Sequence, residues 1–388
     1  MRLILATNHL GLGGSESYLF TIAEELDRLG HGAAIFTREP GAGAAAARKR
    51  GIEVVDDLGA AGDLDAAIVQ DAGTSHELAG RLPDLPQLFV AHSETYDLQL
   101  PPQLEGQVAV AVALNDRVAR RLEALAAPLE VVRLRQPIDI EHNGAAGPLP
   151  EVPRRALLLS NNPVADRLAL IERACAGAGL ELVRLGGDSG QAEDPRQALG
   201  RVEIVIGYGR SVLEAMAAGR AAYVYDRYGG DGWVTSESYD TLEADGFAGR
   251  DRDTTVDADR LGSDLRAYDA TMGPANRDLV VANHRANVHA QELIELLRPL
   301  APAARDHLPH EEMARLVRLE WRARVEVQSL RRELDRRHEQ LEQSQRQTAE
   351  AEARTEQIRR NYESTLSWRA TERLRAARDL LRRLRARR

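Results

Sequence analysis

This chain of 388 residues has one cysteine, Cys175, and one lysine, Lys49, and aromatic residues make up only 4% of it. A single cysteine excludes an internal disulfide and any cysteine-rich metal site. With one lysine, a buried phosphate has to be met by arginine. No apolar run approaches the ~18–20 residues of a membrane-spanning helix. The apolar start Met1–Thr7 is interrupted by Asn8 and His9 too early for a signal peptide. We therefore expect a cytoplasmic protein.

Charge is distributed unevenly. The net charge is −9, but residues 366–388 hold nine arginines and two acidic residues, so this tail carries +7 and the remainder −16. A chain this acidic is not a general nucleic-acid binder. In the tail, Leu374, Leu381 and Leu384 recur at helical spacing with arginines on the other face, which is typical of a helix on an anionic membrane surface. A solvated basic helix, or one that binds a partner, is the alternative.

The length predicts two or three domains. Over the first 300 residues short apolar runs alternate with amphipathic stretches, which predicts parallel sheets covered by helices on both faces. The Gly/Pro-rich segment 144–153 predicts a linker between a domain over 1–143 and a smaller one over 154–300. Such sheets bind ligands at the carboxyl ends of their strands. The expected strands are Leu3–Thr7, Ala33–Thr37, Ala66–Gln70, Gln87–Ala91, Val108–Ala113, Ala156–Ser160, Leu180–Leu185, Glu203–Ile206 and Ala221–Tyr225, and the expected helices include Ser17–Leu29, Asp116–Ala126, Val164–Ala178 and Val212–Ala218.

From about residue 309 the sequence becomes highly charged and almost free of glycine and proline, which predicts a long helix over 309–365. A heptad runs through Val327 and Leu334, with Leu330 and Ile358 at its second apolar position. About seven of its twelve seam residues are apolar, so the seam is weak. Two interpretations stay open, a dimeric coiled coil and a solvated single helix.

The segment Thr7–Glu16, TNHLGLGGSE, leads from the first expected strand into a helix. Glycines at such a turn let backbone N–H groups approach a ligand, and the helix N-terminus behind them favours an anion. The spacing of Gly11, Gly13 and Gly14 is not that of the dinucleotide fingerprint. The segment is either a phosphate-binding turn or an ordinary turn capped by Ser15 or Ser17.

A second glycine turn lies in GYGRSVLEAMAAG, residues 207–219, and is followed by an expected helix that begins at Ser211. Ser211 and Glu214 fit a capping box, with serine at the N-cap and glutamate at N3. That interpretation gives Glu214 a purely structural role. In the functional interpretation, the same helix N-terminus binds a phosphate and Glu214 meets sugar hydroxyls.

Four segments, in the same order, resemble family 4 glycosyltransferases of the GT-B fold. GLGGSESYLFTIAEELDRLGHGAAIFT resembles their Gly-Gly-x-Glu opening, and QPIDIEHN at 136–143 resembles their domain-junction signature. LELVRLGGD at 180–188 resembles a glycine-ending strand, and GRSVLEAMAAGRAAYVYDRYGGDG resembles their Leu-Glu-Ala-Met-Ala-x-Gly helix with the following loop. The resemblance covers about residues 1–300. It implies an α/β fold of two Rossmann-like domains facing a cleft, here followed by a long helical extension.

The resemblance also implies roles for individual residues. Gly13 and Gly14 would line the cleft beside the donor phosphates. His92, in FVAHSETY, matches a histidine near the reacting sugar and would orient that sugar or accept a proton. Glu214 matches the second glutamate of a Glu-x7-Glu element that binds the nucleotide ribose. Arg167 stands where relatives have a lysine that contacts the pyrophosphate, although the two side chains are not equivalent donors.

The sequence departs from the family at several of its sites. Ile206 stands where the family has the first glutamate of Glu-x7-Glu, and Asn161 or Asn162 stands where it has a phosphate-binding arginine. The stretch 187–203 is too short for the strand and helix that usually contact the base. Arg210 is the candidate to supply the missing positive charge.

For several of these residues a purely structural role is the alternative to a functional one. His92 also fits a core histidine, and His9 fits a strand-end residue that binds nothing. Cys175 lies in an alanine-rich stretch and is expected to serve packing. The loop around Asp226, Asp231 and Trp233 either closes over the donor or is an ordinary turn.

Together these features predict a glycosyltransferase that moves a sugar from a nucleotide-diphosphate donor to an acceptor hydroxyl, with retention of configuration as the family implies. The transition state resembles an oxocarbenium ion leaving a pyrophosphate, whose charge Arg167, Arg210 and the helix from Ser211 would stabilise. No cluster has metal-ligand spacing, and no metal and no cofactor are expected.

The expected partners are a nucleotide sugar, a glycan or lipid-linked acceptor, a second copy through the coiled coil, and an anionic surface on the inner face of the membrane. The end of the chain, STLSWRATERLR, also resembles the ends of bacterial cell-surface glycan transferases, which suggests a role in cell-surface glycan assembly. No nucleic acid is expected. The alternative function is a non-catalytic GT-B binding or scaffold protein that acts through its coiled coil, which Ile206, Asn161 and Asn162 favour.

Overall fold

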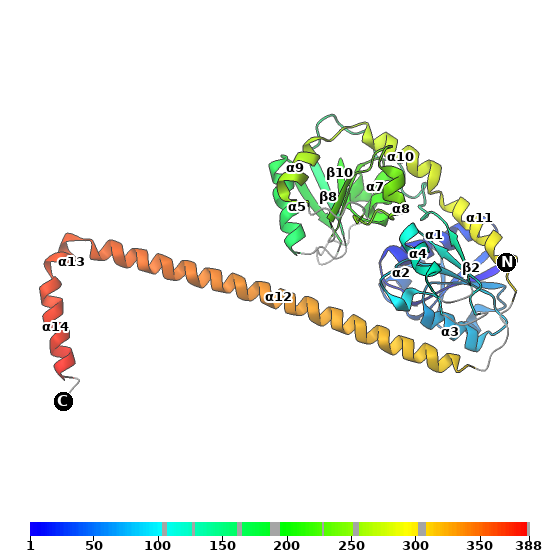
Figure 1. Ribbon diagram of the computed structural model, residues 1–388, viewed down its shortest axis with the longest axis horizontal. Helices are drawn as coiled ribbons and strands as arrows, with labels where there is room; N and C mark the ends of the chain where they lie inside the picture. The colour runs from blue at the N-terminus through cyan, green and yellow to red at the C-terminus, as the bar shows by residue number, and fades with distance from the viewer. Residues whose placement is uncertain are drawn as a thin grey trace. The chain divides into compact units, whose positions relative to one another are not determined.

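The computed structural model describes residues 1–102, 107–125, 129–160, 165–186, 195–226, 229–250, 256–301 and 308–385 (Figure 1). The chain divides into two compact units, residues 1–318 and residues 319–388. The first unit contains a seven-stranded and a five-stranded sheet, each with helices packed on both faces. This is the α/β fold that the sequence predicts.

The first sheet is parallel throughout, in the order β3-β2-β1-β4-β5-β6-β7. Successive residues of its interior strand β1 enter different cores, Leu3 and Leu5 on one face and Ile4 and Ala6 on the other. An unbroken apolar run forms such a strand because both of its faces are covered. The strands are β1 (Arg2–His9), β2 (Gly32–Glu39), β3 (Glu53–Val55), β4 (Ala66–Val69), β5 (Gln87–Ala91), β6 (Val110–Ala113) and β7 (Glu130–Arg133), and the helices on them are α1 (Gly14–Arg28), α2 (Ala42–Lys49), α3 (Ala72–Arg81) and α4 (Asp116–Glu123).

The second sheet has the order β12-β11-β10-β8-β9 and is parallel except for β12, which pairs antiparallel with β11. Its central strand β10 is fully buried, whereas β1 of the first sheet is exposed at its two end residues. The strands are β8 (Arg155–Leu159), β9 (Glu181–Leu185), β10 (Ile204–Gly207), β11 (Ala221–Asp226) and β12 (Gly229–Trp233). The helices around them are α5 (Ala165–Gly177), α6 (Pro195–Leu199), α7 (Arg210–Ala217), α8 (Tyr239–Ala244), α9 (Ala258–Arg266) and α10 (Met272–Asn283).

All nine expected strands are present, with ends within two residues of the predicted ones. Residues 144–154, which include the predicted linker, form neither helix nor strand. After α10 the chain returns to the first sheet, because Ala290, Leu293 and Ile294 of α11 (Ala286–Leu297) lie in the core that the first sheet shares with α1. The chain crosses between the two sheets twice, and a parallel β-bridge between Ile138 and Arg285 joins the two connecting segments.

The predicted long helix is α12 (His310–Glu363), and its first residues belong to the first unit. His310 meets His76 of α3 with 3.2 Å between the two Nδ1 atoms, and both side chains are buried. Arg318 donates to buried Glu77 of the same helix at 2.7 Å. The beginning of α12 is therefore anchored on α3.

The second unit consists of the rest of α12, α13 (Leu366–Ala370) and α14 (Glu372–Arg385). Val327, Leu330 and Leu334 of the predicted seam are between 46% and 67% exposed. A change of direction follows α12, where the Trp368 ring lies 3.5 Å from the Arg375 guanidinium carbon (Figure 1). Among the described residues, no helix is both long and apolar enough to cross a membrane.

Candidate functional site

The glycine turn after β1 passes directly into α1, whose N-cap is Gly13. No side chain caps this helix, so the serine-capped turn that the sequence allows does not form. Glu16 lies over the turn instead, and its Oε2 accepts a hydrogen bond from the Ser15 hydroxyl at 2.9 Å. A Cβ atom on Gly13 would lie 2.7 Å from that same oxygen, so a larger residue there would displace the Glu16 carboxylate from the turn. A carboxylate thus occupies the N-terminus of α1, where the helix dipole favours negative charge.

Helix α7 follows the central strand of the second sheet, and its N-cap is Gly209 rather than Ser211. Gly209 has a φ of 58°, a left-handed conformation that favours glycine, and it starts the helix two residues earlier than a Ser211 cap would. The Ser211 hydroxyl donates to the Tyr208 carbonyl at 2.8 Å. The capping box is therefore wrong: Glu214 is not at N3, and it accepts a hydrogen bond from Arg210 Nε at 3.1 Å.

Arg210 connects three parts of the first unit. Besides Glu214, its guanidinium donates to the Pro137 carbonyl at 3.1 Å and to the Thr21 hydroxyl of α1 at 3.2 Å. Its side chain is only 10% exposed, and burial lowers the pKa of Arg210 while the Glu214 charge opposes that shift. A Cβ atom on Gly14 would lie 3.9 Å from the Arg210 Cβ, so the first turns of α1 and α7 adjoin each other.

His92 lies directly after β5 and is half-buried beside these helix ends. Its Nε2 is 2.8 Å from the side-chain nitrogen of Gln70, and its ring meets the Tyr18 ring edge to face at 5.0 Å. Burial and, to a smaller extent, the nearby charge of Arg210 lower the pKa of His92 to about 3. The imidazole is therefore neutral at physiological pH.

Two histidines that sequence reasoning passed over bind the segment that follows β7 and leads to the second sheet. His289 of α11 binds the Tyr18 hydroxyl at 2.8 Å and the Arg135 carbonyl at 3.0 Å. His284, at the end of α10, binds the Tyr239 hydroxyl and the Gln136 carbonyl, each at 2.8 Å. Burial lowers the pKa of His289 to about 3 and that of His284 to about 4, so both serve as neutral hydrogen-bonding groups.

The other predicted donor-binding residues have contacts of their own or are not described. Arg167 of α5 donates to the Tyr225 hydroxyl at 3.4 Å, a contact within the second sheet and its helices. Ile206 is fully buried in the core between the second sheet, α5 and α9, so the side chain in place of the family's first glutamate serves packing. Asn161, Asn162 and, in the stretch 187–203, residues 187–194 lie outside the described residues.

The remaining candidates have ordinary structural surroundings. His9 faces Glu39, with 3.7 Å between Nδ1 and the carboxylate. Trp233 ends β12 and donates from its indole nitrogen to the Asp264 carbonyl at 2.9 Å, so this part of the predicted loop forms a hairpin strand. Cys175 is buried in α5, as its packing role predicts, and burial raises the pKa of its thiol to about 11.

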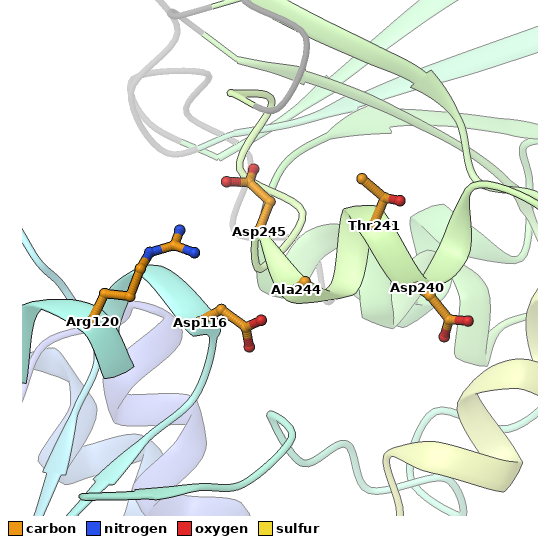
Figure 2. A pocket seen from close by; sticks show the side chains of 6 residues that line it. All are labelled: Asp116, Arg120, Asp240, Thr241, Ala244 and Asp245. Carbon is orange, nitrogen blue, oxygen red and sulfur yellow. The ribbon is translucent and has the colours of Figure 1, made fainter. Parts of the chain in front are cut away.

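An open hollow of about 430 Å³ lies between α4 and α8 (Figure 2). Two of its three acidic residues are paired with arginines, because Arg133 donates to Asp116 at 2.9 Å and Arg117 pairs with Asp245. None of the sequence-predicted site residues lines it, and no cluster of three or more potential metal ligands occurs in the described ranges. The lining residues are Asp116, Arg120, Asp240, Thr241, Ala244 and Asp245.

No protein-family profile and no curated protein sequence matches the chain. Solved structures do match. A glycosyltransferase from Rickettsia africae superposes with a TM-score of 0.51 at 14% identity, over 76% of this chain and 97% of that chain. HepE of Anabaena in complex with UDP and glucose gives 0.55 at 12% identity, over 77% and 100%. HepE in complex with UDP-glucose gives 0.54 at 13% identity, over the same shares. At these identities the likeness defines the fold, and the fold is the predicted GT-B arrangement of two Rossmann-like domains.

Proposed function

We propose that the chain is a glycosyltransferase whose nucleotide-diphosphate sugar binds where the first turns of α1 and α7 adjoin. The observation that carries the proposal is the approach of Gly14 to Arg210, which brings together two helix N-termini, each following an interior strand of its own sheet. Helix N-termini and an arginine at the carboxyl ends of parallel strands suit a diphosphate. That HepE, which shares the fold, is solved with UDP and with UDP-glucose supports this choice of ligand.

The reaction breaks the bond between the anomeric carbon and the diphosphate oxygen and forms one between that carbon and the acceptor oxygen. Negative charge develops on the leaving diphosphate, where Arg210 and the two helix N-termini stabilise it. A histidine with a pKa of about 3 is a weak base, so the acceptor proton passes to the departing diphosphate. The family 4 resemblance further suggests retention of configuration and an acceptor in cell-surface glycan assembly.

Binding of the donor requires two carboxylates to rearrange. Glu16 occupies the N-terminus of α1, and Glu214 is paired with Arg210. A diphosphate carries the same sign of charge as both groups, so it displaces Glu16 from the turn and takes over the Arg210 interaction. Glu214 is then available for the ribose hydroxyls, the role that the resemblance implies.

Glu214→Gln tests this assignment through UDP affinity. A hydrogen bond to a charged group contributes roughly 1.5–3 kcal/mol, so we expect UDP to bind about ten- to hundredfold more weakly. Arg167→Ala should also weaken binding, because the resemblance gives Arg167 a charge-assisted contact to the pyrophosphate, for which it would leave the Tyr225 hydroxyl. Calorimetry of both variants, with melting curves, measures the effect. Glu172→Gln on exposed α5 surface is the matched control and should bind UDP normally. Wild-type protein that does not bind UDP, or unchanged affinity in both variants, would favour the scaffold function.

We further propose that α12 pairs with α12 of a second copy along the predicted seam. Exposed Val327, Leu330 and Leu334 gain roughly 1.5–3 kcal/mol each when they are fully buried. Light scattering should therefore report a dimer for wild type and a monomer for the double variant Leu330→Glu, Leu334→Glu. Val325→Glu is the control, because Val325 is equally exposed but lies off the seam. A wild-type monomer would rule the pairing out.

For the tail we propose reversible binding to an anionic membrane surface. Leu374, Leu381 and Leu384 of α14 are exposed, and the segment from residue 366 carries +7. Each arginine near such a surface contributes about 1 kcal/mol. Co-sedimentation with vesicles that contain phosphatidylserine should pellet the full chain and leave a chain ending at Ser364 in solution. Equal pelleting of the two would contradict the proposal.

A further inference from the structure

Gln70 makes a contact that sequence reasoning did not foresee. It follows β4, is 4% exposed, and its side-chain nitrogen lies 2.8 Å from His92 Nε2 and 3.4 Å from the Ser15 carbonyl oxygen. A carbonyl oxygen only accepts hydrogen bonds, so the amide nitrogen, rather than the amide oxygen, has to face Ser15. The same nitrogen then donates its other hydrogen to His92.

This donation determines where the His92 proton lies. Nε2 accepts from Gln70, so it carries no hydrogen, and a neutral imidazole must then hold its single proton on Nδ1. If the Gln70 amide were turned over, its oxygen would face the Ser15 carbonyl oxygen, and two hydrogen-bond acceptors would meet. Burial and the charge of Arg210 both keep the ring neutral.

A second set of contacts keeps the ring in place. Tyr18 is fully buried and packs edge to face on His92, while its hydroxyl is 2.8 Å from His289 Nε2. His289 in turn is 3.0 Å from the Arg135 carbonyl between the two sheets. Exchange of the two ring nitrogens would require the His92 ring to turn against this packed tyrosine.

We propose that Gln70 is a positioning residue that holds His92 as the neutral Nδ1–H tautomer, so that His92 donates a hydrogen bond to the sugar of the donor. The sugar contact rests on the proposed glycosyltransferase function, whereas the tautomer does not. His92 therefore selects for the sugar part of the nucleotide sugar, and Gln70 acts on that selection without touching the ligand.

Nitrogen NMR of the full chain labelled with ¹⁵N-histidine tests the tautomer directly, with the His92 signals assigned from a His92→Asn sample. We expect a protonated Nδ1 and a bare Nε2 in wild type at pH 7.5. In Gln70→Glu the new carboxylate can only accept, so Nε2 should become protonated. A protonated Nε2 in wild type, or signals unchanged by Gln70→Glu, would overturn the proposal.

Ligand affinity separates this proposal from the proposed function. In Gln70→Met, which keeps the volume but lacks the donor, UDP-glucose should bind about two- to tenfold more weakly, the contribution of one neutral hydrogen bond. UDP should bind as in wild type, which also shows that the variant is folded. Equal affinity of wild type and Gln70→Met for UDP-glucose would overturn the sugar contact. Failure of wild type to bind either ligand would instead refute the proposed function and leave the NMR result standing.

Discussion

Acidification from pH 7 to pH 5 should lower the free energy of unfolding by on the order of 5 kcal/mol. His92, His284 and His289 have pKa values of about 3, 4 and 3 in the folded chain, against an ordinary value near 6.5. Below pH 6.5 these three histidines bind protons in the unfolded chain but stay neutral in the folded chain. Each histidine then costs about 1.4 kcal/mol of stability per pH unit until the folded pKa is reached.

Buried carboxyl groups act in the opposite direction. Burial raises the pKa of Glu25, of Asp71 and of Asp245, so the folded chain takes up these protons before the unfolded chain does. They offset part of the loss at the acidic end of the range. His92 is half-buried, which also reduces its share. The net loss is still a large part of the ~5–15 kcal/mol that stabilises a typical domain.

Urea unfolding at pH 7.5, 6.5, 5.5 and 5.0 measures this dependence. His289→Gln removes one of the three titrating groups and keeps a side chain able to bind Tyr18, so the dependence on pH should fall by about a third. His338→Gln is the control, because that histidine is 72% exposed on α12. Stability that is flat between pH 7 and pH 5 would contradict the expected burial of neutral histidines.

Gly43→Ala should destabilise the first domain by about 1–3 kcal/mol, although alanine is the better helix former by about 1 kcal/mol. Gly43 lies in α2, and a Cβ atom there would be 2.1 Å from the Gly11 carbonyl oxygen and 2.7 Å from that of Leu10. Both oxygens are backbone atoms of the glycine turn. Either α2 moves away from the turn or the turn moves, and in the second case UDP affinity falls together with the melting temperature.

Gly177→Ala is the matched control for this clash. Gly177 is also helical, in α5, and an added Cβ would meet nothing within 4 Å. Its replacement should leave stability unchanged or raise it by up to about 1 kcal/mol. A Gly43→Ala protein that melts at or above the wild-type temperature would show that α2 yields without strain.

Most of the strands that the sequence identifies are buried on both faces, and the edge strand β9 is the exception. Parallel strands between two helix layers consist of nearly continuous apolar runs, such as Ile4–Ala6 in β1, and these stand out against any surroundings. β3 and β7 were missed because they are short edge strands that mix charged and apolar residues. β12, GGDGW, has no strand pattern and exists through its antiparallel pairing with β11.

The site was predictable only where its features are local in the chain. The glycine turns and the helices behind them follow from residues that are neighbours in sequence. The start of α7 was misplaced because the backbone conformation of Gly209, rather than the hydroxyl of Ser211, begins the helix. The contacts of His92 with Gln70 and Tyr18 could not be predicted, because they join different strands and helices. Tyr18 in turn meets His289, 271 positions away in the sequence, only when α11 returns to the first sheet.

That return of α11 has a consequence during synthesis of the chain on the ribosome. The strands of the first sheet are complete at Arg133, but Ala290, Leu293 and Ile294 of its core emerge only about 160 residues later. At about 5–20 residues per second, the nascent first domain waits roughly ten to thirty seconds with one face covered by α1 and α2 but not yet by α11. The second sheet, whose strands lie wholly between these points, is therefore finished first, and chaperones that bind apolar surface have their longest opportunity on the domain made earliest.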